Sequence, residues 1–210
     1  MTKISCEVRN LGQRFNHFYL FRELSFQISM GEIWMIKGNN GTGKSTLLKI
    51  LSGGMEPGNG EVLFFGDDKK IDSHLIWKQI SMVAPYQELP EELSLNELID
   101  FQILMSSRKI ERKEFDRLIS LFGMGKDAAK PTEQYSTGMK QKAKIILALG
   151  ENRPILFLDE PTSNLDPESF DRFWEMVKEM KNEKLVITAS NDEKELQNGK
   201  LILELGKDTI

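Results

Sequence analysis

The sequence has little cysteine, no long apolar runs and little net charge, and each shortage excludes a class of protein. Cys6 is the one cysteine among 210 residues, so no disulfide can form within the chain and a reducing compartment is expected. The longest apolar runs have about five residues, against the roughly 20 that a membrane-spanning helix needs. With 28 basic and 32 acidic residues the net charge is −4, which disfavours a nucleic-acid partner.

The first residues also lack the apolar centre of a signal peptide, so we expect a soluble chain that is not exported by that route. Its length predicts a single domain over residues 1–210. Strands are expected in the first sixty-five residues, including the buried apolar run 33–36. More strands are expected at 155–158, 185–187 and 201–205, with a helix over 167–180 between the first two. This alternation implies an α/β fold with a parallel sheet covered by helices.

Residues 93–150 have a different hydrophobic pattern, with apolar side chains recurring every three and four positions. That spacing predicts a small helical insert, and Pro131 interrupts it. The insert would leave residues 1–92 and 151–210 as the core of the domain.

Residues 38–45 read GNNGTGKS and match the phosphate-loop pattern G-x-x-x-x-G-K-[ST] at every fixed position. A strand before the loop and a helix after it make a chance glycine-rich turn a poor explanation. Glycines permit positive φ, so backbone N–H groups can turn inward around phosphate oxygens at the positive end of the helix. Lys44 would place its charge on the β- and γ-phosphates, and the Ser45 hydroxyl would bind Mg²⁺. The candidate nucleotide-binding residues are Gly38, Asn39, Asn40, Gly41, Thr42, Gly43, Lys44, Ser45 and Thr46.

The apolar strand at 155–158 ends in two carboxylates, Asp159 and Glu160. Ligands gather at the carboxyl ends of strands in open parallel sheets. Asp159 would then lie near the Mg²⁺, and Glu160 would orient or deprotonate a water that attacks the γ-phosphate. Taken alone, the pattern fits a solvated acidic turn at least as well, and it is the phosphate loop that favours the functional interpretation.

Two further segments make the chain resemble an ATP-binding cassette ATPase. Residues 135–142 read YSTGMKQK and are similar to the signature of that family, of the type L-S-G-G-Q, while residues 161–166, PTSNLD, resemble its D-loop. The four motifs occur in the family's order over nearly the whole chain. The resemblance implies a P-loop NTPase core with a parallel sheet, an N-terminal antiparallel part and a helical insert.

The resemblance also implies that ATP and Mg²⁺ are held between two cassettes that pair head to tail. Ser136 and Gly138 of the signature would contact the nucleotide of a second cassette chain, with a homodimer expected. The residue types agree with this role, because serine caps a helix and glycine lets the backbone approach phosphate. In isolation the segment is better explained as an ordinary capped helix.

Three positions are less clear matches to the family. Phe15 stands where an aromatic residue stacks on adenine, and Phe18 and Tyr19 are rivals for that role. Asn191 occupies the place of the switch histidine, so it can donate a hydrogen bond to the γ-phosphate but cannot take a proton near neutral pH. Gln87 lies two residues after the nominal Q-loop position, where the family's glutamine touches Mg²⁺, and an exposed loop residue is an equal alternative.

These features predict a slow but active ATPase subunit at the cytoplasmic face of a membrane, working with a separate membrane-spanning transporter chain. The Y-S-x-G-M-K-Q form resembles cassettes of exporters. The helical insert and the Q-loop would dock on that chain, and Trp77, Tyr86 and Phe101 are candidates for the surface although aromatic residues are more often core. The alternative is a soluble cassette that acts on a protein assembly, such as iron–sulfur cluster biogenesis. A small-molecule kinase is disfavoured, because nothing between residues 79 and 150 resembles an acceptor-binding lid.

Overall fold

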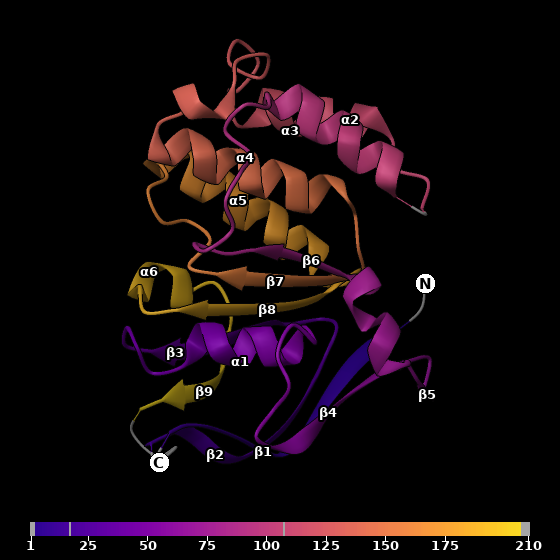
Figure 1. Ribbon diagram of the computed structural model, residues 1–210, viewed down its shortest axis with the longest axis vertical. Helices are drawn as coiled ribbons and strands as arrows, with labels where there is room; N and C mark the ends of the chain where they lie inside the picture. The colour runs from indigo at the N-terminus through magenta and orange to yellow at the C-terminus, as the bar shows by residue number, and fades with distance from the viewer. Residues whose placement is uncertain (1–2, 17, 107, 207–210) are drawn as a thin grey trace. The chain divides into compact units, whose positions relative to one another are not determined.

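The computed structural model describes residues 3–16, 18–106 and 108–206, which form two compact units. The core unit consists of Met1–Met82, Arg153–Glu160 and Val177–Ile210, and the helical unit consists of Val83–Asn152 and Pro161–Met176. Figure 1 labels the helices and strands of both units. The functional division that we expect between residues 93–150 and the rest of the chain stays a prediction.

A five-stranded sheet carries the segments that bear the phosphate loop and the acidic strand end. Its strand order is β6 (Ile80–Val83), β7 (Ile155–Asp159), β8 (Leu185–Ser190), β3 (Ile33–Gly38) and β9 (Lys200–Leu205). β3 pairs in parallel with β8 and with β9, and β7 pairs in parallel with β8. Every residue of β7 and β8 is buried, as their continuous apolar runs predict. The predicted α/β class with a parallel sheet is confirmed.

A second sheet is antiparallel and is built from the first part of the chain. Its order is β2 (Phe18–Ser29), β1 (Ile4–Phe15), β4 (Asn59–Gly66) and β5 (Lys69–Lys70). The pairing of β1 with β2 contains a bulge, because Arg14 lies opposite Tyr19 while Gln13 lies opposite Phe21. The extra residue on β2 places Tyr19 and Phe21 on opposite faces of the sheet. A 3₁₀ helix, Ser73–Gln79, follows β5.

One apolar core joins both sheets through α1 (Lys44–Leu51). Leu47 and Leu48 of this helix are fully buried with Phe21 of the antiparallel sheet and Phe157 of the parallel sheet. Cys6 lies in the same core, and burial raises the pKa of its thiol, so it stays protonated at neutral pH. No helix within residues 3–16, 18–106 and 108–206 combines the length and apolar character that crossing a bilayer requires.

The helical unit contains α2 (Leu95–Met105), α3 (Arg112–Leu121), α4 (Thr137–Gly150) and most of α5 (Pro167–Met180). A capping box between Ser94 and Glu97 begins α2. Arg112 at the start of α3 donates hydrogen bonds to side chains of α2, which holds the two helices together. The short helix α6 (Glu193–Leu196) belongs to the core unit.

Gly150 of α4 packs directly against Phe115 of α3. A Cβ at this position would lie 2.1 Å from a ring carbon of Phe115, which is fully buried. We expect Gly150→Ala to lower the free energy of unfolding by about 1–3 kcal/mol, because overpacking outweighs the better helix propensity of alanine. Urea unfolding measures this change. Gly125→Ala is the control, since no atom lies within 4 Å of a Cβ there, and equal loss in both variants would contradict the packing argument.

Candidate nucleotide-binding site

The phosphate loop connects β3 to α1, and its backbone turns where its glycines are placed. Gly41 has φ 84° and Gly43 has φ 100°, both in the left-handed region. Gly38 is required for a different reason, because a Cβ there would lie 2.5 Å from Thr42 Oγ1. That hydroxyl donates to Asn39 O at 2.9 Å and closes the loop. No acidic residue lies in the first turn of α1, so no side chain of that turn neutralises the positive end of the helix, which faces the loop.

Lys44 lies buried under this loop, with 5% of its surface exposed. Its Nζ donates to Gly38 O at 2.8 Å and to Asn39 O at 3.3 Å, and it lies 3.4 Å from Glu160 Oε1. Two backbone carbonyl groups of the loop and the Glu160 carboxylate thus hold the Lys44 ammonium in place. A phosphate bound in the loop would find this charge already in place.

Asp159, the last residue of β7, is 1% exposed, and its Oδ2 has no hydrogen-bond partner within the described residues. Burial raises the pKa of this carboxyl group, and a hydrogen bond from Ser45 opposes the shift. An orphaned carboxylate oxygen beside a hydroxyl fits Mg²⁺, which prefers oxygen ligands and keeps water and substrate phosphates in its coordination shell. Among the described residues, no group of three or more His, Cys, Asp or Glu side chains is arranged so that it could hold a metal ion.

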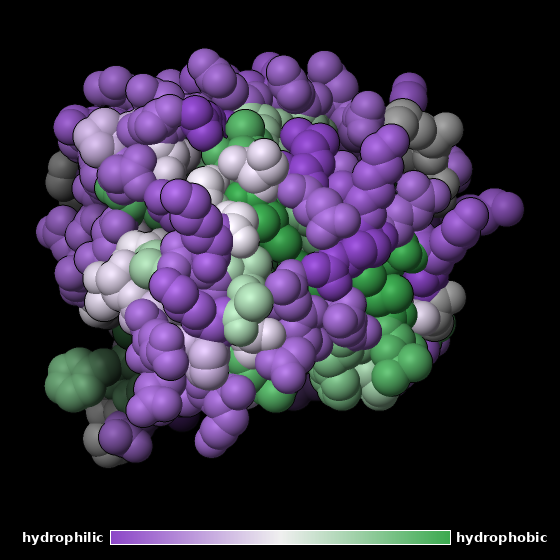
Figure 2. All heavy atoms as spheres, turned by 90° about the horizontal axis from the view of Figure 1, so that it is seen from above, coloured by the Kyte–Doolittle hydropathy of each residue, from purple (hydrophilic) through white to green (hydrophobic). Residues whose placement is uncertain are grey.

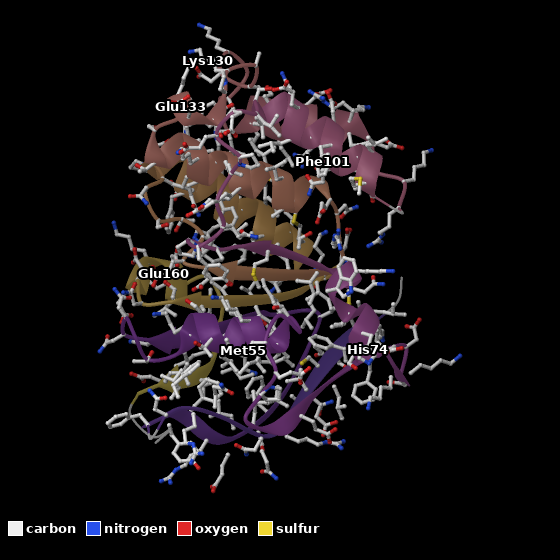
Figure 3. All side chains as sticks on the ribbon, viewed as in Figure 1. Met55, His74, Phe101, Lys130, Glu133 and Glu160 are labelled. Atoms are coloured by element: carbon white, nitrogen blue, oxygen red, sulfur yellow. The ribbon has the colours of Figure 1, made fainter. Side chains whose placement is uncertain are left out.

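Glu160 follows directly and has φ 46°, a conformation that is strained for a residue other than glycine. Its N–H donates to Ala189 O at 2.9 Å, which fixes the turn against β8. The turn sends the carboxylate toward Lys44, while 30% of the side chain stays exposed to solvent. Figure 3 shows Glu160 at the end of β7. A carboxylate that touches both the phosphate-loop lysine and solvent is positioned to act on a water molecule.

Asn191 comes directly after β8, and its Nδ2 donates to Asn40 Oδ1 of the phosphate loop at 3.0 Å. Its place beside the loop follows from the sheet, because β8 lies between β3 and β7 and all three are parallel. Three segments that are far apart in the sequence therefore bring their predicted residues to the same edge of the sheet.

The signature segment opens α4 in the helical unit. Ser136 is the N-cap, and its Oγ accepts a hydrogen bond from Met139 N at 3.3 Å. A Cβ at Gly138 would lie 2.8 Å from Asn164 O, so glycine lets the D-loop pack directly on the start of the helix. The N-terminal end of α4 offers the backbone N–H groups that an anion needs.

Two residues that the sequence did not single out tie the D-loop to the same helix. Gln141 Nε2 donates to Pro161 O at 2.5 Å, and Lys142 Nζ lies 2.7 Å from Asp166 Oδ2. The hydrogen bond from Lys142 lowers the pKa of the Asp166 carboxyl well below its usual range. The signal for both was their spacing, since positions three and four residues after Gly138 lie on its face of the helix.

Comparison with known proteins decides the family. The family model described as ABC transporter matches residues 21–163, which is more than half of the chain. The chain belongs to the ABC transporter family. The predicted family, fold class and ATPase class of this cassette are thereby confirmed.

Relatives of the cassette include larger proteins. It is 36% identical over 178 residues to the methionine import ATP-binding protein MetN of Erwinia pyrifoliae, covering 81% of this chain and 54% of that protein. It is 29% identical over 199 residues to ABC transporter A family member 8 of Dictyostelium discoideum, covering 90% of this chain and 24% of that protein. The cassette thus spans between about a quarter and about half of the length of these two relatives.

Among solved structures, the cassette is similar to the dimeric structure of MJ0796, a bacterial ABC transporter cassette. The TM-score is 0.83 at 22% identity, over 96% of this chain and 97% of that chain. At this identity the likeness shows that the two chains share their fold.

Phe15 and Tyr19 lie on different faces of the antiparallel sheet of this cassette. Phe15 shares the face of Gln13, which lies opposite Phe21, and a ring carbon of Phe21 would lie 3.4 Å from a Cβ placed at Gly43. Phe15 is therefore on the phosphate-loop side, and Phe18, which lies opposite Phe15, shares that side. This geometry favours Phe15 or Phe18 over Tyr19 for contact with adenine.

Gln87 lies in the helical unit, where its side chain forms a hydrogen bond within its own loop. Its Oε1 accepts from Ala84 N at 2.9 Å, and its N–H donates to Ala84 O at 3.2 Å. The structure therefore holds Gln87 in a tight turn after β6. Its contact with Mg²⁺ stays a prediction.

Trp77, Tyr86 and Phe101 are candidates for the docking surface for which core positions were the more expected outcome, and the core expectation is wrong. Trp77 and Phe101 are each 59% exposed, and Tyr86 is 41% exposed. The apolar spacing around Phe101 suggested a buried position for it. The buried side of α2 is formed by Leu95, Leu98 and Ile99 instead. Figure 2 shows one face of the molecule on which hydrophobic side chains reach the surface among hydrophilic ones.

Proposed function

We propose that this cassette binds ATP with Mg²⁺, pairs with a second copy around the nucleotide, and hydrolyses ATP to drive a separate membrane-spanning transporter chain. The observation that carries the proposal is the convergence of Lys44, Asp159 and Glu160 at one edge of the sheet. Asn191 completes the group through its hydrogen bond to Asn40.

Each residue has a role that its geometry supports. Lys44 and the loop N–H groups hold the phosphates, and Ser45 and Asp159 would hold Mg²⁺, which supplies positive charge to the phosphate oxygens when bound. Glu160 takes the proton of the attacking water, and the Lys44 ammonium, 3.4 Å away, orients its carboxylate. Asn191 donates an amide hydrogen bond toward the γ-phosphate without exchanging protons.

The second copy is proposed from the family resemblance, which implies that the signature of one cassette contacts the nucleotide held by the other. The exposed Ser136 and the start of α4 form an anion-binding surface in the helical unit. A nucleotide held by the phosphate loop of one chain would be enclosed by this surface of the other. Homodimer formation is the simplest arrangement, since one chain carries both surfaces.

The docking surface for the transporter chain is proposed on the helical unit. Phe101, Leu104 and Met105 of α2 are 59%, 80% and 67% exposed, and Tyr86 adds an exposed ring from the Q-loop. Figure 3 labels Phe101 on α2. The spacing of three and four residues places the three α2 side chains on one face of the helix. Exposed apolar side chains of this size are typical of partner surfaces.

Export is proposed as the direction of transport, and the cytoplasmic face of a membrane as the location. The direction rests on the Y-S-x-G-M-K-Q form of the signature at residues 135–141. The relative MetN, by contrast, is named for import.

Co-purification tests the transporter role. A tagged chain is recovered from a detergent extract, beside Phe101→Ser/Leu104→Ser and the control Leu75→Ser, which is exposed in the core unit. We expect an integral membrane protein to be recovered with the parent and the control, and lost with the α2 variant. Recovery of a soluble scaffold instead would favour the iron–sulfur assembly alternative and contradict the transporter role.

Asn191→His is expected to introduce a pH dependence into ATP hydrolysis that the parent lacks at this position. The imidazole titrates near pH 6.5 and asparagine does not titrate, so the ratio of variant to parent rate should change about 2-fold or more between pH 6 and 8. Asn182→His, at an exposed position, is the control and should keep a constant ratio. A constant ratio for Asn191→His as well would show that residue 191 does not contact the reacting phosphate.

A further inference from the structure

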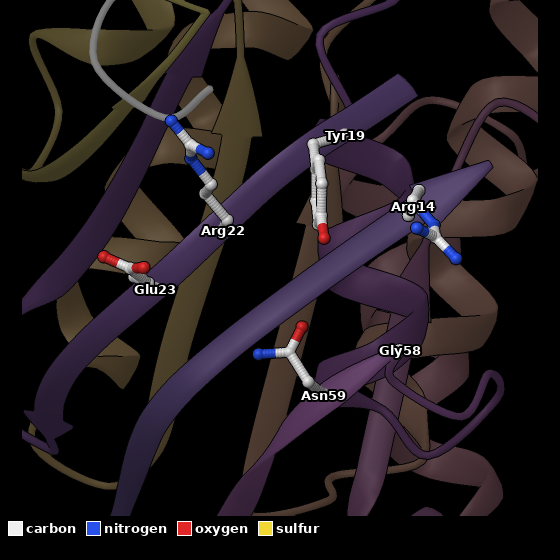
Figure 4. Close-up of a pocket in the computed structure, with 6 residues that line it drawn as sticks. All are labelled: Arg14, Tyr19, Arg22, Glu23, Gly58 and Asn59. Atoms are coloured by element: carbon white, nitrogen blue, oxygen red, sulfur yellow. The ribbon is translucent and has the colours of Figure 1, made fainter. Parts of the chain in front are cut away.

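A second pocket lies on the antiparallel sheet of the core unit, and the nucleotide site does not use it. It has a volume of about 520 Å³ and is lined by Arg14, Tyr19, Arg22, Glu23, Gly58 and Asn59, as Figure 4 shows. We call it the outer pocket. Its volume is within the range of small-molecule sites.

The outer pocket and the phosphate loop are on opposite faces of this sheet. Arg14 lies opposite Tyr19, while the neighbouring Gln13 lies opposite Phe21, and successive residues of a strand point to opposite faces. Phe21 and the preceding Leu20 are the side chains that come close to Gly43 of the phosphate loop. Arg14 and Tyr19 therefore face away from the loop, so a ligand in the outer pocket would not occupy the ATP site.

Two arginines in the outer pocket carry unneutralised charge. Within the described residues, neither the Arg14 nor the Arg22 guanidinium forms an ion pair or a hydrogen bond, although Glu23 lies in the wall. Arg9 on the same sheet behaves differently, because it pairs with Glu7 and Glu61. Two cations that share one pocket repel each other, and an anion between them would remove that repulsion.

Tyr19 holds both guanidinium groups in position. Arg14 Cζ is 5.8 Å and Arg22 Cζ is 6.0 Å from the centre of its ring, and Figure 4 shows the two side chains on either side of the tyrosine. A guanidinium that stacks on an aromatic ring keeps its N–H donors free at its edge, where they match the oxygens of phosphate or carboxylate. The pocket is thus organised for an anion before any anion binds.

We propose that the outer pocket binds a small phosphate-bearing anion. Phosphate is favoured over a single carboxylate because it carries about −1.5 to −2 charge at neutral pH, which matches two guanidinium groups. The Tyr19 hydroxyl supplies one further donor in the same pocket.

Calorimetric titration with pyrophosphate tests this proposal. The titrated protein is the full chain carrying Lys44→Ala, which weakens phosphate binding in the phosphate loop. We expect one saturable site, and about tenfold or more loss of affinity when Arg14→Gln and Arg22→Gln are added. Arg9→Gln is the matched control, since it removes a paired arginine from the same sheet, and it should leave the affinity unchanged. Circular dichroism confirms that each variant is folded.

Three results would overturn the assignment. The first is absence of saturable binding to the Lys44→Ala chain, and the second is equal loss of affinity in the Arg9→Gln control. The third is binding to vesicles that contain anionic lipid without binding to pyrophosphate, which would indicate a membrane contact instead. Arg14→Lys with Arg22→Lys should bind several-fold more weakly than arginine, and equal binding would contradict recognition by the planar guanidinium.

Discussion

Glu160→Gln is expected to slow ATP hydrolysis by about 10²–10⁴-fold, which is the usual contribution of a general base. Glutamine keeps the size of the side chain but cannot accept the proton of the attacking water. The substitution also removes the ion pair at 3.4 Å with Lys44, whose Nζ keeps its hydrogen bonds to Gly38 O and Asn39 O. ATP binding should therefore survive, and the measurement is phosphate release at saturating ATP beside ATP affinity by calorimetry.

Glu175→Gln is the matched control for this experiment. Glu175 is an exposed glutamate on α5 in the helical unit and has no role in the proposed chemistry, so its loss should leave the rate unchanged. If Glu160→Gln hydrolyses ATP as fast as the parent, Glu160 is not the base.

Lys44→Ala is expected to weaken ATP binding by about 10- to 100-fold. A hydrogen bond to a charged group contributes about 1.5–3 kcal/mol, and 1.4 kcal/mol corresponds to a tenfold change in affinity. The structure supports a value in this range, because the ammonium is already buried at the loop. Calorimetric titration with ATP and Mg²⁺ measures the change.

Lys69→Ala provides the comparison, since Lys69 is an exposed lysine of the same unit on β5. Its removal changes the net charge of the chain by the same amount. Equal weakening in both variants would show a general effect of charge and would contradict a specific contact of Lys44 with phosphate.

The parts of the site that follow from local sequence were predictable. Residues 38–45 form their loop from a fixed spacing of glycines, lysine and serine, and Gly41 and Gly43 have the positive φ that the motif requires. Asp159 ends a buried strand with a continuous apolar run and Glu160 follows it, and the parallel pairing of β7 with β8 brings Asn191 to the same edge. In each case a short pattern determines the local backbone, and the strand order of the sheet brings the segments together.

Features that depend on tertiary contacts were not predictable in the same way. The bulge on β2 determines the face of the sheet on which Tyr19 lies, and no short pattern in residues 18–29 predicts that bulge. The exposure of Phe101 depends on which stripe of α2 packs inward, and both stripes contain apolar residues. Gln141 and Lys142 gain their roles from the D-loop, which lies about twenty residues further along the chain.

Light scattering on the Glu160→Gln variant tests the central claim most directly, because ATP that is not hydrolysed should join two chains. We predict that the molar mass doubles from 24.1 kDa when ATP and Mg²⁺ are added. Adding Gly138→Asp should prevent the doubling while ATP still binds, since an acidic side chain at the start of α4 repels phosphate and displaces the D-loop. A mass that stays at 24.1 kDa with ATP bound would contradict a nucleotide held between two copies of this cassette.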